Sequence, residues 1–237
     1  MTTIDARTDS RDRLRKEKVG AYLTRLGIVP ETAGPPNRQL LTRLQQAHVT
    51  IVPFETLAIT GDPYCEREGE GVYLLVPHLY KKIVEPERGG YCFELNGLFC
   101  ALLAALGYDV HRAAARIVSD GAICTPANHH TNIVELDRQY VVDVGMGPPT
   151  HRIPLPLDDT PRPLHYFEAK NDYLQSVPES PFTGAPAVTL STETGYRKLS
   201  GDPFVEIDGA DRCERTITDD AWHDFLEQKF GLRYRSG

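Results

Sequence analysis

Long apolar runs are missing from the sequence. No segment reaches the roughly 18 uninterrupted apolar residues that a membrane-spanning helix needs, so we expect no membrane association. Residues 1–18 are rich in charge and lack the apolar stretch of a secretory signal, which favours a cytoplasmic protein. Basic runs are missing as well. The 26 lysines and arginines are outnumbered by 33 aspartates and glutamates, and the net charge of −7 leaves little to bind nucleic-acid phosphates.

Cysteine is scarce, with five residues in a chain of 237. An odd number at irregular spacings does not suit a disulfide framework, so we expect free thiols. The zinc-ligand spacings Cys-x-x-Cys and His-x-x-x-His are also missing, and adjacent His129 and His130 do not easily bind one metal from one strand face. The sequence therefore predicts no metal cofactor and at least one thiol that is available for chemistry.

Helical spacing dominates the first part of the chain, and 41% hydrophobic residues are enough to bury a core. Apolar residues recur at intervals of three and four over residues 14–26 and 40–48. Residues 92–107, CFELNGLFCALLAALG, are apolar on most of the helix circumference. This pattern predicts a buried central helix that ends at Gly107.

Strand patterns follow from residue 110 onward. The segments that alternate like strands are RAAARIV, HHTNIVEL and QYVVDVGMG, followed later by PAVTLST and PFVEID. Residues 148–164, PPTHRIPLPLDDTPRPL, are rich in proline and are interpreted as a linker. Thr218 is expected to cap a last helix. Helices first, then antiparallel strands, then a terminal helix indicate an α+β fold.

Cys92 has the setting of a nucleophile. It follows Arg88-Gly89-Gly90-Tyr91 and opens the long helix, where the positive end of the helix macrodipole favours a thiolate. The two glycines permit a tight turn into the helix and leave room for a ligand. The alternative is that Cys92 is a small buried apolar residue, which is common for a free cysteine. We assign that structural role to Cys100.

A cysteine nucleophile needs a base, and the base needs an orienting group. His129 or His130 on one predicted strand and Asp143 on the next could supply both, because facing residues of an antiparallel pair have Cβ atoms about 5 Å apart. A two-residue turn between the strands would put Asp143 on the face of His130, and a three-residue turn would put it on the face of His129. An ordinary strand Asp with an exposed His pair is the other interpretation. The spacing alone leaves the choice open.

The run RGGYCFELNGLF resembles the nucleophile signature of the arylamine N-acetyltransferases, a family that uses a Cys-His-Asp triad. Four further segments are similar to elements of that family in the same order: VPFETL, YVVDVGMG, NDYLQSVPESPF and DFLEQKFGL. The resemblance extends from about Tyr22 to Leu232 and therefore covers most of the chain.

The resemblance implies a role for each residue of a triad. Cys92 would be the nucleophile that accepts the acyl group, and Asp143 would orient the base. In the family the base precedes a strand valine by five residues, and counting back from Val134 selects His129, with His130 as the second choice.

Further site residues follow from the resemblance. Arg88 and Glu55 would form a pair that braces the active site, and Thr125 and Tyr173 would contact coenzyme A. The implied reaction is ping-pong: acetyl-coenzyme A acylates the cysteine, coenzyme A leaves, and an arylamine, hydrazine or arylhydroxylamine takes the acetyl group. The implied fold is a helical bundle over residues 1–107, a β-barrel-like middle domain over 108–170 and an α/β lid over 171–237.

One segment departs from the family pattern. Between residues 147 and 171 the family has several more strands, at about 5–6 residues each, and an interdomain connection. We therefore expect a shortened middle domain. Two other functions follow from this difference: an amide synthase that transfers a larger acyl chain to an arylamine, aided by a carrier protein, or a non-catalytic remnant that keeps the fold.

Overall fold

The computed structural model describes residues 12–61, 69–119, 122–148 and 157–233. Its helices are α1 (Lys16–Arg25), α2 (Arg38–Ile51), α3 (Leu57–Thr60), α4 (Val76–Ile83), α5 (Cys92–Ala105), α6 (Glu168–Ser176) and α7 (Asp219–Phe230), with 3₁₀ turns at Pro30–Thr32 and Leu164–Phe167. Its strands are β1 (Phe54–Glu55), β2 (Asp109–Ala115), β3 (Val118–Ser119), β4 (Ala122–Ile123), β5 (His129–Glu135), β6 (Gln139–Val142), β7 (Leu157–Arg162), β8 (Ala187–Ser191), β9 (Gly195–Ser200), β10 (Pro203–Asp208) and β11 (Asp211–Thr216). The predicted α+β class is confirmed.

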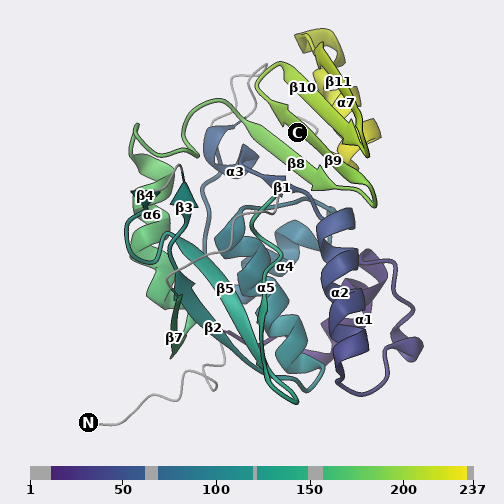
Figure 1. Cartoon of the computed structure of the whole chain (residues 1–237), viewed down its shortest axis with the longest axis vertical. Helices are drawn as coiled ribbons and strands as arrows, with labels where there is room; N and C mark the ends of the chain where they lie inside the picture. Colours follow the sequence, from purple (N-terminus) through teal and green to yellow (C-terminus); the bar gives the residue numbers. More distant parts are fainter. Residues whose placement is uncertain (1–11, 62–68, 120–121, 149–156, 234–237) are drawn as a thin grey trace.

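The predicted central helix is α5, which lies between the helices of the N-terminal part and the sheet that contains β2 and β5 (Figure 1). Twelve of its 14 residues are buried, because the apolar side chains surround the helix rather than forming one stripe. Its first residue is Cys92, and Glu94 in the first turn accepts a hydrogen bond from the backbone N–H of the N-cap residue Tyr91. The sequence pattern therefore identified both the burial and the start of this helix.

The middle sheet is antiparallel, with strand order β6-β5-β2-β7, and among the described residues it is open rather than a closed barrel. The interpretation of residues 148–164 as a linker is wrong for Leu157–Arg162, because these residues form β7 and pair with β2. Its proline, Pro161, lies where the pairing register shifts, and proline is tolerated at an edge strand or a bulge. The rest of the predicted linker includes residues 149–156, which lie outside the described part, as does Cys65.

A second sheet has the order β1-β8-β9-β10-β11 and packs against α7 around a separate apolar core that contains Trp222, Phe225 and Phe230 (Figure 1). β1 comes from the N-terminal part of the chain and pairs with β8, with Phe54 opposite Thr189. The described N-terminal part therefore contributes a strand to the C-terminal sheet. Among the described helices, none combines the length and the apolar character needed to cross a bilayer.

Candidate active site

Cys92 is held at the first residue of α5, and its side chain is almost completely buried at 2% exposure. The loop after β6 passes directly against this helix end. A Cβ atom on Gly145 would lie 2.7 Å from the Cα of Cys92, a distance that a real side chain does not tolerate. Glycine at this position therefore allows the loop that carries Asp143 to approach the helix that carries the thiol. Cys92, Cys100, Cys124 and Cys213 are free thiols, as expected for the described cysteines.

The turn between β5 and β6 decides which histidine faces Asp143. Glu135 pairs with Gln139, so the turn contains three residues, 136–138. Because side chains alternate along a strand, a three-residue turn places Asp143 on the same face as His129. The Nε2 atom of His129 lies 2.5 Å from Oδ2 of Asp143.

His130 points the other way. Its ring stacks on Phe167, with ring centroids 4.6 Å apart, and it is completely buried. Burial holds the pKa of His130 well below its usual range, so this imidazole stays neutral. The structure therefore brings His129 to Asp143 and uses His130 in packing.

His129 and Asp143 shift each other's pKa values so that both side chains favour their charged forms. Burial alone would lower the pKa of His129, but the Asp143 carboxylate, with a smaller contribution from Cys92, outweighs it and raises the pKa to about 10. Burial would also raise the pKa of Asp143, and the charge and hydrogen bond of His129 overcome this and lower it. An imidazolium beside a carboxylate is the expected state at neutral pH. Because Nε2 is used by Asp143, Nδ1 is the ring nitrogen that remains for the thiol.

Asn96 connects the parts of this site, and the sequence analysis did not single it out. Its Nδ2 donates to Oδ1 of Asp143 at 3.0 Å and to the carbonyl oxygen of His130 at 2.6 Å. Its Oδ1 accepts from the backbone N–H of Val144 at 2.9 Å. The only signal in the sequence is a polar residue in a helix that is apolar apart from Glu94 in its first turn. One amide group thus holds the carboxylate and both strands against α5.

The predicted pair of Arg88 and Glu55 is present in the structure, where Nη2 of Arg88 lies 3.1 Å from Oε1 of Glu55. The second carboxylate oxygen of Glu55 accepts from the backbone N–H of Leu57 at 2.6 Å. Burial would raise the pKa of Glu55, but Lys82 and then Arg88 outweigh it and lower the pKa to about 2. The backbone N–H of Glu55 also donates to the carbonyl oxygen of Gly90 at 3.0 Å, so Glu55 contacts the nucleophile loop twice.

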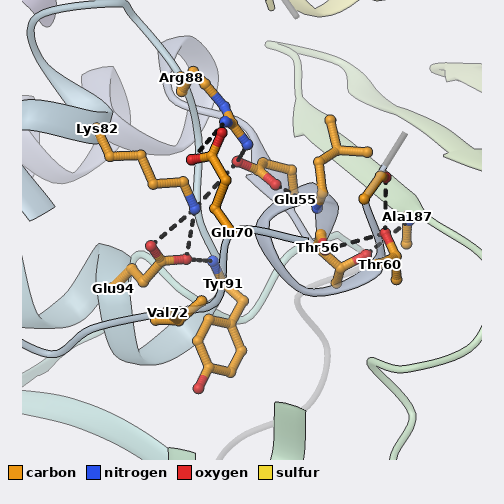
Figure 2. Close-up of polar contacts among 12 residues, drawn as sticks. Glu55, Thr56, Thr60, Glu70, Val72, Lys82, Arg88, Tyr91, Glu94 and Ala187 are labelled. Atoms are coloured by element: carbon orange, nitrogen blue, oxygen red, sulfur yellow. Dashed lines mark hydrogen bonds and ion pairs between the residues drawn. The ribbon is translucent and has the colours of Figure 1, made fainter. Parts of the chain in front are cut away.

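Lys82 of α4 is a second cation at this loop that the sequence analysis missed. Its Nζ atom lies 2.8 and 2.9 Å from the two carboxylate oxygens of Glu94 and 3.3 Å from Glu55 (Figure 2). Burial raises the pKa of Glu94, and Lys82 opposes that shift without cancelling it. Because Glu94 also accepts from the N–H of Tyr91, this network reaches the residue directly before Cys92.

The two residues expected at the coenzyme A site lie on the surface. Tyr173 of α6 is half-exposed, and Thr125 follows β4. Lys170 connects them: its Nζ atom donates to Oγ1 of Thr125 at 3.3 Å and lies 4.9 Å from the centre of the Tyr173 ring. Lys170 adds a positive charge to this pair that the sequence analysis did not consider. Within the described ranges, no group of three or more His, Cys, Asp or Glu residues could hold a metal ion.

A buried thiol beside a histidine and an aspartate, at the start of a buried helix, is the arrangement of a thiol-dependent acyl-transfer enzyme. Comparisons with known proteins identify the particular family. A family model described as N-acetyltransferase matches residues 38–163 and 157–236. The arylamine N-acetyltransferase of Mycolicibacterium smegmatis is 34% identical over 240 residues, which cover 92% of this chain and 83% of that protein.

Solved structures agree with the sequence comparison. The structure of an arylamine N-acetyltransferase from Mycobacterium tuberculosis superposes with a TM-score of 0.75 at 26% identity and covers 90% of this chain and 92% of that chain. An enzyme of the same name from Bacillus cereus, which has a Cys-His-Glu catalytic triad, superposes with a TM-score of 0.76 at 19% identity, covering 91% of this chain and 98% of that chain. The chain belongs to the arylamine N-acetyltransferase family.

Proposed function

We propose that this protein transfers an acetyl group from acetyl-coenzyme A to the nitrogen of an arylamine or hydrazine, or to an arylhydroxylamine, through an acetyl-Cys92 intermediate. The observation that carries the proposal is the contact of 2.5 Å between His129 and Asp143 beside the buried thiol. We assign Asp143 the role that a glutamate would have in the Cys-His-Glu triad described for the Bacillus cereus enzyme. Either carboxylate can orient the imidazole, so the chemistry is the same.

The reaction has two half-reactions. His129 holds the proton that the Cys92 thiol gives up, in keeping with the raised pKa of His129, and the thiolate sulfur attacks the thioester carbonyl carbon of acetyl-coenzyme A. A new carbon–sulfur bond forms, and coenzyme A leaves as a thiol with the proton from His129. The amine nitrogen then attacks the acetyl-Cys92 carbonyl, His129 accepts the nitrogen's proton, and Cys92 is released. Asp143 stabilises the imidazolium in both steps, in accord with the raised pKa of His129.

The donor site proposed for coenzyme A includes Thr125 and Tyr173, with Lys170 between them. An ammonium group on a surface beside a hydroxyl and an aromatic ring suits a phosphate-bearing nucleotide. The partners that this function requires are therefore coenzyme A and a small amine.

A larger acyl donor is the second candidate, because the middle sheet is open between β6 and β7 in the described part of the chain. An open sheet could leave room for a longer acyl chain than a closed barrel does. That function would use the same three residues but a donor other than acetyl-coenzyme A.

Intact-mass measurement tests these functions. Brief incubation with acetyl-coenzyme A should add one acetyl group to the wild type and none to Cys92→Ala, and an added arylamine should remove it. A folded protein that remains unacetylated would refute the proposal, and acylation by a longer-chain thioester in that case would favour the second candidate.

A further inference from the structure

We propose that a second cleft, separate from the triad, is a binding site for an organic anion with an apolar body. The cleft has a volume of about 820 Å³, which suits a small organic ligand. Cys100 is one of its lining residues, and it follows Cys92 by eight residues on the same helix. At about 1.5 Å per residue this places the cleft about 12 Å along α5 from the nucleophile. The proposal does not depend on the acetyl-transfer function.

The cleft lies where the segment before α1 meets α4, the second half of α5 and β2. Much of its lining is apolar and comes from separate elements of the fold. These residues include Leu14, Val76, Tyr80, Ala101, Ala104 and Val110. An apolar ligand body of ring or chain type would bury its surface here, and that burial favours binding.

The charges around the cleft are mostly positive. The basic residues that line it are Arg13, Arg15, Lys16, Lys18, Arg112 and Arg162. The acidic residues of the lining are Asp12 and Asp109, and two carboxylates beside the lining also pair with its cations, Asp158 with Arg162 and Glu85 with Lys18. Six positive charges against four negative ones leave a local excess of two on a chain with a net charge of −7. A concave surface of one sign concentrates ligands of the opposite sign.

Two of these arginines are placed as a pair. Arg112 on β2 and Arg162 on β7 are register partners, and facing residues of neighbouring strands point to the same side of a sheet. Each already contacts one carboxylate, Asp12 at 3.1 Å and Asp158 at 2.8 Å.

Each guanidinium nevertheless keeps a buried Nε–H that has no hydrogen-bond partner among the described residues. The Arg112 side chain is 6% exposed, so its charge is largely removed from water. Leaving a buried donor unsatisfied is costly, and an anion in the cleft would compensate part of that cost. Because the guanidinium group matches a carboxylate geometrically, we assign the ligand a carboxylate head group.

Titration of the ¹⁵N-labelled full chain with naphthalene-2-carboxylate tests the proposal, and naphthalene-2-carboxamide is the uncharged control. We expect saturable NMR shifts at the amides of Ala101, Ala104 and Arg112. We expect binding of the carboxamide to be about tenfold weaker, because it lacks the charge-assisted hydrogen bonds. Neither probe carries an aromatic amine that would make it an acetyl acceptor.

Variants of the rim distinguish this cleft from other surfaces. Arg15→Glu/Lys16→Glu reverses two exposed charges and should weaken carboxylate binding about fivefold. The matched variant Arg38→Glu/Arg43→Glu reverses two exposed charges on α2 and should leave the affinity within about twofold.

Ala104→Phe, which fills the cleft from an exposed helix position, should abolish the saturable shifts. Shifts centred on Cys92 and His129, equal affinity for the carboxamide, or binding that survives the rim reversal would each overturn the proposal.

Discussion

Replacing Lys82 with methionine is expected to uncouple α4 from the start of α5. The substitution keeps most of the side-chain volume but removes the ammonium group that lies 2.8 Å from Glu94. Glu94 is 2% exposed and Lys82 is 16% exposed, so the pair is largely shielded from water. Removing one partner of a buried ion pair costs about 3–5 kcal/mol when the other charge stays. Here Glu94 can take up a proton, and we expect the smaller loss of about 2–3 kcal/mol.

Thermal unfolding measures this loss. For a chain of this size, about 2–3 kcal/mol corresponds to a decrease in Tm of about 4–12 °C. The loss should depend on pH. Burial raises the pKa of Glu94 in the folded state, so ionising this carboxyl as the pH rises costs stability. Loss of Lys82 raises that pKa further, so the difference in stability between wild type and variant should widen as the pH rises above the raised pKa of Glu94 in the wild type.

Three controls make the result specific. Lys82→Arg keeps the charge and should retain most of the stability, and Lys81→Met removes the neighbouring exposed lysine and should change Tm by little. Lys82→Met/Glu94→Gln removes both charges and should recover part of the loss. The reasoning fails if Lys82→Met and Lys81→Met have the same Tm at every pH. Slower acetylation of Cys92 in Lys82→Met, but not in Lys82→Arg, would show that the network also positions the thiol.

Three further substitutions test the site. Asp143→Asn should reduce acetylation about 10³-fold or more. Because the Asp143 carboxylate raises the pKa of His129 to about 10, NMR titration of the variant should show a lower pKa for His129. An unchanged His129 titration would contradict the assigned contact. Gly145→Ala should destabilise the fold by about 1–3 kcal/mol through overpacking, because its Cβ would meet Cys92; denaturant unfolding that matches the wild type would show that the close approach is not needed. Asn96→Ala should lower the free energy of unfolding by about 1–3 kcal/mol, because it leaves the Val144 N–H unsatisfied. Urea unfolding would measure this loss, and an unchanged free energy of unfolding would contradict the role assigned to Asn96.

Much of the site could be predicted because its residues carry local signals. Cys92 is marked by the glycines before it and by the apolar helix after it, and Asp143 is the only carboxylate of the segment YVVDVGMG. The choice between His129 and His130 could not be made from physical patterning, because one residue in a turn inverts the strand face. The three-residue turn that decides it is visible only in the register of Glu135 with Gln139.

The features that were missed depend on long-range contacts. Lys82 looks like any other helix lysine next to Lys81, and only the packing of α4 on α5 places it against Glu94. β7 has no alternating apolar pattern in LDDTPRPL, and its pairing with β2 forms it. β11 is exposed along its whole length, so it has no hydrophobic signal at all. Such elements are fixed by their neighbours in the fold rather than by their own residues.

The pairing of β1 with β8 has a consequence for the order of events during synthesis. Phe54 also forms a bridge with Gly90 of the nucleophile loop, while its partner in the sheet, Thr189, is translated 135 residues later. A chain that emerges from the ribosome N-terminus first can build α5 and the middle sheet early. β1, the segment that braces the nucleophile loop, can pair with β8 only after the C-terminal strands have been synthesised. The protein should therefore become reactive only near the end of its translation.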